Sequence, residues 1–474
     1  MLRFLNAIII LLLAICQPLF SQGYRIEVTL DNMSSDTVFL AYHYGNKQFI
    51  RDTLMVSESG TVTMEGSELL AGGVYLMVMP NMRYFEFLVD EQQKFSIEAD
   101  VNDFLGSLTF HNSSQNTVFL NYQKFLRDHN ARIGALQAKQ KEMIIYPDSL
   151  FIIQDDIDQR NAAFQHYLDS IHAAYPGTFI SDLIYAMSPP KTPEFEIDPM
   201  VSNPDSIKMV LSYGYLRDHY FDQTNFNNVN LIRTPILHNK LSNYFNRILI
   251  QDPDSIIPQV DHVIQLAAGQ AEMFQYVVVF LLNNFLESNI MGMDAVFVDI
   301  AEKYYLSGNA QWADSTYLKR LGDRVARIKP NLIGRKAADL KMETLTREWV
   351  SLHEVVAEYT ILYFWEPNCG FCKEATPQLY SLYEKYRDRG LQVFAVDTQD
   401  NRQEWESYLN EHPYDWINAW DPDQSTYFRF YYDIYSTPTI YLLDKDKTII
   451  AKRVDIESLS QMLDQLLGED AQVN

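Results

Sequence analysis

Hydrophobic and polar residues alternate along the first part of the chain, from Tyr24 to about Asn116. A period of two predicts β-strands, and turn residues such as Gly72 and Gly73 separate the candidate strands. The expected strands are Tyr24–Leu30, Thr37–Tyr44, Phe49–Val56, Thr61–Glu65, Val74–Met79, Tyr84–Val89, Lys94–Ala99 and Ser107–His111. Many short strands at this regular spacing predict an all-β domain over residues 23–116, built as an antiparallel sandwich or barrel.

Near Thr117 the period of the apolar residues becomes helical. Val118, Tyr122 and Phe125 recur at intervals of three and four, which places them on one face of a helix. Further helices are expected over Leu150–Tyr175, Asp205–Phe221, Pro235–Ile250, Ile256–Leu266, Gln270–Glu287, Met293–Leu306 and Asp314–Ile328. The pattern predicts an all-α middle domain over residues 117–331.

From about Leu332 the chain alternates between strand and helix patterns, which is typical of an α/β domain. We expect the strand Ile361–Trp365 and the helix after it to come first. The later elements are expected to be the strand Gly390–Asp397, the helix Asn401–Glu411, the strands Thr439–Asp444 and Thr448–Val454, and the helix Ile456–Leu467. This predicts a third domain over residues 332–474.

Residues 1–22 have the pattern of an export signal. Arg3 supplies a positive charge, Ala7–Ile15 forms an apolar core, and Ser21 is a small residue at a cleavage point. The apolar core is short for a membrane span, so we expect a cleaved signal peptide and an exported protein. The formal charge of −24 argues against nucleic acid as a partner, because phosphates would be repelled.

Two cysteines carry the candidate chemistry. Cys369 and Cys372 follow an apolar strand and precede an amphipathic helix, and the chain's third cysteine, Cys16, lies in the export signal. At such a junction the helix dipole favours thiolate over thiol at Cys369, and Cys372 lies one turn on, close enough to form a disulfide. A zinc site would need four ligands, and the chain has no second cysteine pair. We therefore expect a redox-active disulfide, with no metal and no other cofactor.

The β-rich part resembles a module of unknown function that precedes thioredoxin-like domains in exported Bacteroidetes proteins. Asn116 and Tyr122 stand where that module ends. The other matching segments are Thr37–Tyr42, Arg51–Thr53, Gly60–Val62 and Gly73–Tyr75. The position of the helical domain after this module is also similar to that family, and the resemblance implies no chemistry for either part.

The C-terminal domain resembles the thioredoxin fold, in its exported TlpA/ResA-like branch. The matching segments are Gly334–Leu340, with Ala338 in place of the usual Pro, Phe364-Trp365 before the cysteines, Pro377 in the helix, and Thr437-Pro438-Thr439. The resemblance implies a cis bond at Pro438, a loop of Thr437 and Pro438 that faces the disulfide and holds the substrate backbone, and a Trp365 side chain packed below the cysteines.

Two positions depart from that family, and both affect proton transfer. Tyr363 replaces the buried acid of thioredoxin, and Ala375 replaces a Glu of the ResA-like branch. The proton acceptor for Cys372 could then be Glu374, Glu366 or water. Between the cysteines lie Gly370 and Phe371, followed by Lys373. Lys373 favours the thiolate of Cys369, whereas Phe371 cannot stabilise it by charge, so we expect a comparatively reducing couple.

These observations predict an exported thiol–disulfide oxidoreductase. The resemblance implies a periplasmic or cell-envelope location, disulfide-bearing exported proteins as substrates, and a membrane thiol donor that resets the pair. One alternative is a redox-sensing binding or scaffold protein whose β-rich and helical domains carry the main role. A peroxiredoxin is disfavoured, because Glu366 and Leu362 stand where its Thr or Ser and its Pro would be.

Overall fold

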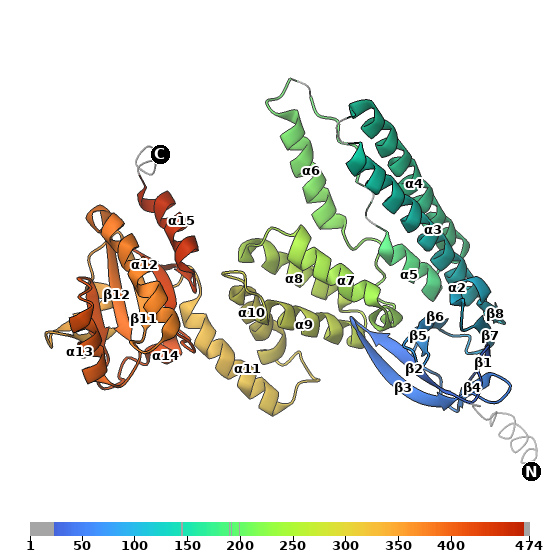
Figure 1. Cartoon of the computed structure of the whole chain (residues 1–474), viewed down its shortest axis with the longest axis horizontal. Helices are drawn as coiled ribbons and strands as arrows, with labels where there is room; N and C mark the ends of the chain where they lie inside the picture. The colour runs from blue at the N-terminus through green and yellow to red at the C-terminus, as the bar shows by residue number, and fades with distance from the viewer. Residues whose placement is uncertain (1–22, 144–145, 189, 191, 199, 469–474) are drawn as a thin grey trace, which may run out of the picture. The chain divides into compact units, whose positions relative to one another are not determined.

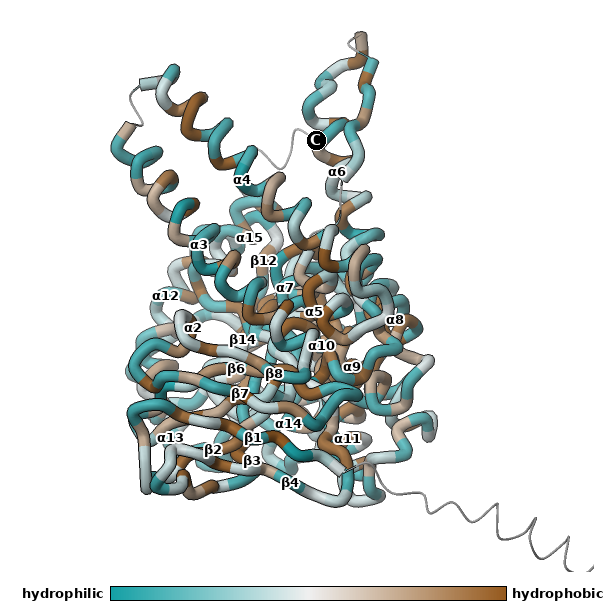
Figure 2. Tube along the Cα trace, turned by 90° about the vertical axis from the view of Figure 1, so that its right-hand side faces the viewer, coloured by the Kyte–Doolittle hydropathy of each residue, from teal (hydrophilic) through white to brown (hydrophobic). Residues whose placement is uncertain are grey.

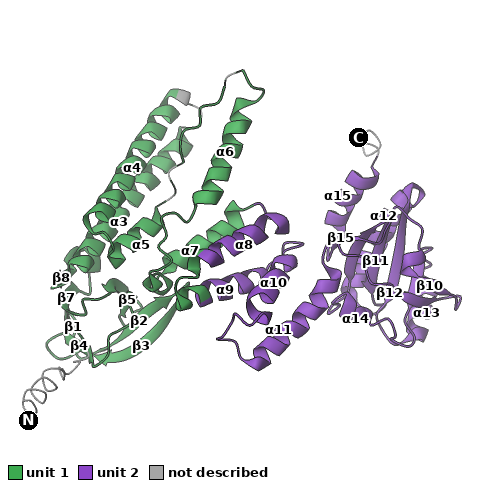
Figure 3. Cartoon of the chain, turned by 180° about the vertical axis from the view of Figure 1, so that it is seen from behind, with its two compact units in different colours: residues 1–249, 266–274 green, residues 250–265, 275–474 purple. Residues whose placement is uncertain are grey.

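The structure is a computed structural model that describes residues 23–143, 146–188, 190, 192–198 and 200–468. The predicted signal peptide, residues 1–22, lies outside the described residues. The chain divides into two compact units, one within residues 1–249 and 266–274 and the other within 250–265 and 275–474 (Figure 3). In the part of the chain that is described, no helix combines the length and apolar character that a membrane crossing requires.

The first part of the chain is a β-sandwich (Figure 1). Its strands are β1 (Tyr24–Asp31), β2 (Thr37–Tyr44), β3 (Lys47–Met55), β4 (Thr61–Gly66), β5 (Gly73–Val78), β6 (Tyr84–Val89), β7 (Lys94–Asp100) and β8 (Thr109–His111), with the helix α2 (Phe104–Ser107) before β8. One sheet has the order β4-β1-β7-β8 and the other β3-β2-β5-β6. Side chains of both sheets share one hydrophobic core, which is why apolar residues alternate along the strands. The predicted sandwich is confirmed.

The direction of one strand pair corrects the expectation of an antiparallel sandwich. β1 and β7 are parallel, with Ile26 opposite Phe95 and Val28 opposite Ile97. The other pairs in the two sheets are antiparallel. A parallel pair needs a long connection, and here the strands from β2 to β6 lie between the two in sequence. Alternation indicates which face of a strand is buried, but it does not indicate the direction of its neighbour.

Asn116, near the start of α3 (Ser114–Glu142), completes the edge strand β6. Its side-chain oxygen accepts the Leu88 N–H at 2.6 Å, and its side-chain nitrogen donates to the Leu88 carbonyl at 2.9 Å. The Asn116 residue is only 1% exposed. The carboxamide thus bonds both backbone groups of Leu88, as an adjacent strand would, and leaves neither group buried without a partner.

We therefore expect Asn116→Ala to lower the free energy of unfolding of the β-sandwich by about 3 kcal/mol, because both Leu88 backbone groups lose their partner. Asn121→Ala, the control on the same helix, removes an exposed carboxamide and should cost less than about 0.5 kcal/mol. Urea unfolding followed by far-UV circular dichroism measures both costs. Hydrogen exchange at the Leu88 amide shows whether the loss is local, and equal stability of the two variants would contradict this role.

The middle of the chain is helical, as predicted. In the first unit the helices after α3 are α4 (Pro147–Ala174), α5 (Phe179–Met187), α6 (Pro204–His219) and α7 (Pro235–Asn243). The sequence pattern did not predict α5. Six of its nine residues are buried, and it is hydrophobic along most of its length (Figure 2). With nine residues, α5 is shorter than the stretch over which a helical period can be recognised reliably in a sequence.

The later helices are α8 (Pro253–Ala267), α9 (Ala271–Leu286), α10 (Asp294–Ile300) and α11 (Ser315–Ile328). In α11 the buried residues Leu321, Val325 and Ile328 recur at intervals of four and three, so one face of the helix packs inward. Asp314 caps its first turn by accepting the Tyr317 N–H at 2.8 Å. The helix also carries Arg320, Arg324 and Arg327.

The C-terminal part is a seven-stranded sheet with helices on both faces. Its elements are β9 (Lys341–Thr344), β10 (Trp349–Ser351), β11 (Tyr359–Trp365), α12 (Gly370–Tyr386), β12 (Leu391–Asp397), α13 (Arg402–Glu411), β13 (Ile417–Trp420), α14 (Phe428–Tyr431), β14 (Thr439–Asp444), β15 (Ile449–Lys452) and α15 (Ile456–Leu467). The strand order is β10-β9-β13-β12-β11-β14-β15, with β11, β12 and β13 parallel. One core lies under α12, α13 and α15, and a second lies under α14. The predicted α/β fold is confirmed.

The expectation that the cysteine strand comes first in this domain was wrong. The antiparallel hairpin of β9 and β10 precedes it and joins the sheet next to β13. β13 itself was also not predicted. These strands have only three or four residues, which is too short for an alternating pattern to stand out from chance.

Candidate active site

The two cysteines lie between β11 and α12, at the carboxyl edge of the central parallel strands. Cys369 is the N-cap residue of α12, and its Sγ accepts the Cys372 N–H at 3.1 Å. The sulfur thus bonds one of the N–H groups that have no partner inside the helix. The helix dipole favours negative charge at the same position. The Cys369 sulfur therefore lies at the positive end of α12.

The two thiols are free and differ in exposure. Cys369 is partly exposed, whereas Cys372 is 1% exposed and lies in the core under α12. Burial, reinforced by the hydrogen bond with Cys369, raises the pKa of the Cys372 thiol to about 12. Because the thiolate is the nucleophile, the buried Cys372 thiol is the less suited of the two to attack an incoming disulfide.

The loop between α14 and β14 faces Cys369. The Thr437–Pro438 peptide bond is cis, as the family resemblance implied. The Cys369 thiol donates to the Thr437 carbonyl at 3.3 Å, and the Thr439 hydroxyl donates to the Ser436 carbonyl at 2.7 Å. The fold therefore brings Thr437 to the cysteine pair, which lies more than sixty residues earlier in the sequence.

Three parts of the sequence match described families. Residues 333–452 match the AhpC/TSA family, residues 183–331 match the domain of unknown function DUF5106, and residues 24–119 match the domain of unknown function DUF4369.

Individual relatives match the C-terminal domain. Thiol-disulfide oxidoreductase ResA of Bacillus cereus is 24% identical over 130 residues, which is 27% of this chain and 74% of the relative. A domain of a possible thiol-disulfide isomerase from Cytophaga hutchinsonii is 39% identical, with 97% of that chain and 30% of this one covered at a TM-score of 0.28. The C-terminal domain belongs to the ResA-like thiol–disulfide oxidoreductases. A thioredoxin-like protein from Bacteroides caccae is also similar, at 22% identity over 58% of this chain and 97% of that one, with a TM-score of 0.45.

The chain is thus a thioredoxin-like thiol–disulfide oxidoreductase, which confirms the predicted enzyme class. In the ResA-like domain, the residue that replaces the thioredoxin acid lies under the cysteine pair. Tyr363 is fully buried, and its hydroxyl shares a 2.8 Å hydrogen bond with the Thr376 hydroxyl, which donates to the Cys372 carbonyl at 2.7 Å. Burial raises the pKa of Tyr363 well above its usual range. Tyr363 therefore stays neutral, and cannot take the place of the missing carboxylate as a base.

Trp365 is buried beside Tyr363, with the two rings parallel and their centroids 6.4 Å apart. Next to the cysteines, Gly370 and Phe371 are exposed, and 76% of Phe371 faces solvent. Lys373 is also exposed. It lines a cleft of about 470 Å³ with Pro367, Asn368, Pro377 and residues of α13. The resemblance placed Trp365 below the cysteines, and the ring packs in the same core as Cys372.

The carboxylates proposed as proton acceptors for Cys372 lie in different settings. Glu374 is exposed on the outer face of α12. Glu366 accepts hydrogen bonds from the Thr398 hydroxyl at 2.6 Å and from the Gln399 side chain at 3.1 Å, and its backbone lies against the Cys372 thiol. Neither carboxylate bonds the Cys372 thiol among the described contacts, so Glu374, Glu366 and water all stay candidates for the proton acceptor.

Asp397 is a candidate that the sequence reading missed. It ends β12, opposite Trp365 on β11, and is 1% exposed. Burial, reinforced by the nearby charge of Glu366, raises the pKa of its carboxyl to about 8. A carboxyl group with such a pKa in an active-site region is a functional candidate. The sequence did contain a signal for this residue: an acidic side chain at the end of a buried strand that was expected to lie beside the cysteine strand.

Among the described residues, no three His, Cys, Asp or Glu side chains converge in a way that could hold a metal ion. Thioredoxin-like oxidoreductases use a redox-active disulfide rather than an external cofactor.

Proposed function

We propose that this chain reduces disulfides of exported proteins through the pair Cys369 and Cys372. The observation that carries the proposal is the contrast between the two thiols. One is partly exposed at the N-cap of α12 and faces the Thr437 carbonyl, while the other is buried beneath it. A two-cysteine cycle requires a nucleophile that is accessible from outside and a second thiol that is accessible only to the first.

In the proposed cycle the Cys369 thiolate attacks one sulfur of a substrate disulfide. A mixed disulfide forms, and the other substrate sulfur leaves as a thiolate that takes up a proton. Cys372 then loses its proton and attacks the Cys369 sulfur, which forms the Cys369–Cys372 disulfide and releases the second substrate thiol. Two electrons pass to the substrate, and a thiol donor in the membrane returns two electrons to the pair.

Thr437 and Pro438 are proposed to hold the substrate backbone during the attack. The Thr437 carbonyl already accepts a bond from the Cys369 thiol, so it lies within reach of a substrate chain that approaches that sulfur. Phe371, exposed between the cysteines, offers apolar contact beside the sulfur. The periplasm or cell envelope is the proposed location, in keeping with the export signal pattern of residues 1–22.

The reduction potential of the pair tests the proposed direction. With Phe371 rather than a cationic residue beside the thiolate, we expect a potential more negative than about −200 mV. The chain is equilibrated with dithiothreitol buffers and alkylated, and mass spectrometry then follows the peptide that contains both cysteines. The proposal is supported if both thiols become protected from alkylation in one step, with a midpoint below that potential. If both thiols resist alkylation in the native chain at every potential, or never pair, the cycle is wrong.

A further inference from the structure

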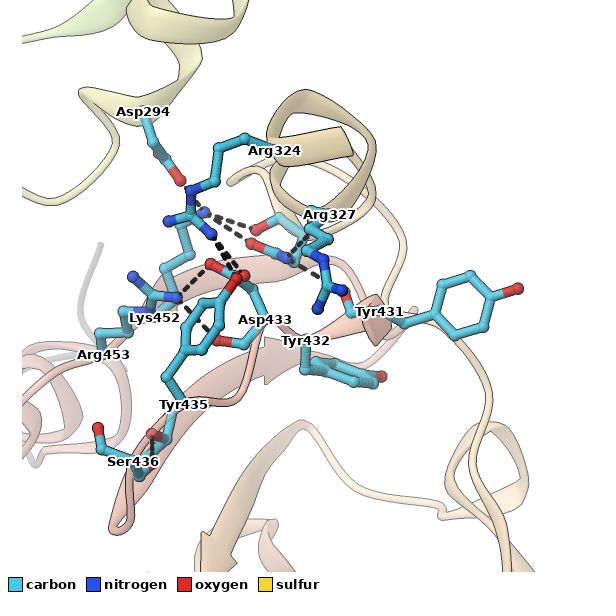
Figure 4. A network of polar contacts seen from close by, with 12 residues as sticks. Asp294, Arg324, Arg327, Tyr431, Tyr432, Asp433, Tyr435, Ser436, Lys452 and Arg453 are labelled. Atoms are coloured by element: carbon cyan, nitrogen blue, oxygen red, sulfur yellow. Dashed lines mark hydrogen bonds and ion pairs between the residues drawn. The ribbon is translucent and has the colours of Figure 1, made fainter. Parts of the chain in front are cut away.

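Helix α11 contacts the segment that leads into the Pro438 loop (Figure 4). Nη1 of Arg324 donates to the Asp433 carboxylate at 2.6 Å and to the Tyr435 hydroxyl at 3.1 Å. The guanidinium carbon also lies 5.4 Å from the centroid of the Tyr435 ring. One side chain of a helix outside the sheet domain thus holds two residues just before Thr437.

The partner of Arg324 is a buried charge. The Asp433 side chain is 1% exposed, and Nη2 of Arg453 donates to its second carboxylate oxygen at 2.6 Å and to its backbone carbonyl at 2.9 Å. Burying a carboxylate is costly unless cations pair with it. Arg324 and Arg453 approach Asp433 from different elements, so together they fix where this residue lies.

A short chain of contacts connects Asp433 with the nucleophile. The Tyr441 hydroxyl holds the Tyr432 carbonyl at 2.6 Å, which anchors the start of the segment to β14. Four residues after Asp433, the Thr437 carbonyl accepts the Cys369 thiol. Between these points Arg324 holds Tyr435, which is otherwise 65% exposed. Without Arg324, the span between the anchored Asp433 backbone and Thr437 loses its contact with α11.

Contacts of Asn331, which lies just after α11 and donates to the Arg327 carbonyl at 2.8 Å, keep the end of the helix in place without Arg324. Nζ of Lys452 bonds Asp294, and it donates to the backbone and side-chain oxygens of Asn331 at 2.9 and 3.0 Å. The Asn331 side chain in turn donates to the Tyr431 carbonyl at 3.1 Å. The Lys452 side chain is 6% exposed, so this second contact is well buried. Removing Arg324 should therefore release the loop without detaching the helix.

We propose that Arg324 is a positioning residue for disulfide exchange: by holding Asp433 and Tyr435, it fixes the Thr437 carbonyl where the substrate backbone must bind. This inference rests on the proposed function and adds to it a task for α11, which precedes the sheet domain. The redox domain then depends on its neighbouring helix for the shape of its substrate site, not for its cysteine chemistry.

The test measures reduction of insulin by dithiothreitol with the full chain as catalyst. Arg324→Ala should raise KM for insulin about tenfold and leave kcat within about twofold, because substrate binding loses its fixed loop. Arg324→Lys keeps the charge and one donor, and should recover part of the loss. The control is Arg327→Ala on the same helix, whose guanidinium lies over the Phe430 ring and bonds neither Asp433 nor Tyr435.

Hydrogen exchange separates failure of this inference from failure of the proposed function. In Arg324→Ala the amides of Tyr435, Ser436 and Thr437 should exchange faster than in Arg327→Ala, whether or not the chain turns over insulin. With an active wild-type chain, an unchanged KM in Arg324→Ala overturns the inference. An inactive wild-type chain overturns the proposed function instead. In that case the exchange rates of the loop amides still test the positioning role. Faster exchange in Arg324→Ala than in Arg327→Ala supports this role, and equal exchange overturns it.

Discussion

Cys372→Ser should convert the chain into a trap that holds its substrate through a stable mixed disulfide at Cys369. The reason lies in the burial of the second thiol. Cys372 is 1% exposed, and its backbone N–H donates to the Cys369 sulfur, so in the wild-type chain it is placed to attack that sulfur from inside. A serine hydroxyl in the same position cannot displace the substrate sulfur. Turnover of a protein disulfide should therefore fall about a thousandfold or more.

Cys369→Ser is the matched variant. It also abolishes turnover, but it should form no mixed disulfide, because the remaining thiol is buried and burial holds its pKa at about 12. Non-reducing gels and mass spectrometry of the captured species distinguish the two variants. Full-rate turnover by Cys372→Ser would disprove the two-cysteine cycle, and capture of substrate by Cys369→Ser would reverse the two roles.

Much of this site could be predicted from sequence because its parts are local. Cys369 and Cys372 are separated by two residues and lie between a strand pattern and a helix pattern, so the N-cap position of Cys369 follows from their order alone. Pro438 lies far away in the sequence, and only family resemblance connected it with the cysteines. The contact between Cys369 and Thr437 depends on the antiparallel pairing of β11 with β14, which no local pattern encodes.

Asp397 and Arg324 could not be recognised in the same way. Along the sequence, Asp397 is one polar residue at the end of an apolar strand, and its unusual carboxyl arises only when β11 and β13 pack on either side. Arg324 belongs to the polar face of an amphipathic helix, where an arginine usually contacts water. Its partner Asp433 lies more than a hundred residues later, so the pair exists only after α11 packs against the sheet domain. The environments of both residues are properties of the tertiary structure.

The buried Asp397 carboxyl should make the stability of the domain depend strongly on pH. The free energy of unfolding of the ResA-like domain should fall as pH rises from about 4 to about 8, and Asp397→Asn should remove most of that fall. The pKa of the Asp397 carboxyl is about 8 in the folded domain, against an ordinary value of 3.8. Between these values the folded domain keeps a proton that the unfolded chain has released. The contribution of this proton to the free energy of unfolding is fully present below pH 4, and it is lost as pH rises toward 8.

The size of the effect follows from the cost of a buried charge. Each pKa unit corresponds to about 1.4 kcal/mol, and a loss on the order of 3 kcal/mol between pH 4 and pH 8 allows for relaxation around the ionised group. Among the described residues, one carboxyl oxygen of Asp397 has no hydrogen-bond partner, so little compensates its charge. Asparagine keeps the shape but cannot ionise, which removes the dependence on pH even where it lowers stability overall.

Tryptophan fluorescence can follow this unfolding, because five of the six tryptophans lie from Trp349 onward. Urea titrations at pH 5 and pH 9 give the change in stability for each variant. Glu366→Gln is the matched control: its charge helps to raise the pKa of Asp397, so the variant should keep the fall but move it to lower pH. If Asp397→Asn loses as much stability as the wild-type chain over this range, another group titrates. The buried carboxyl beside Trp365 would then keep one protonation state over this whole range, contrary to a pKa of about 8.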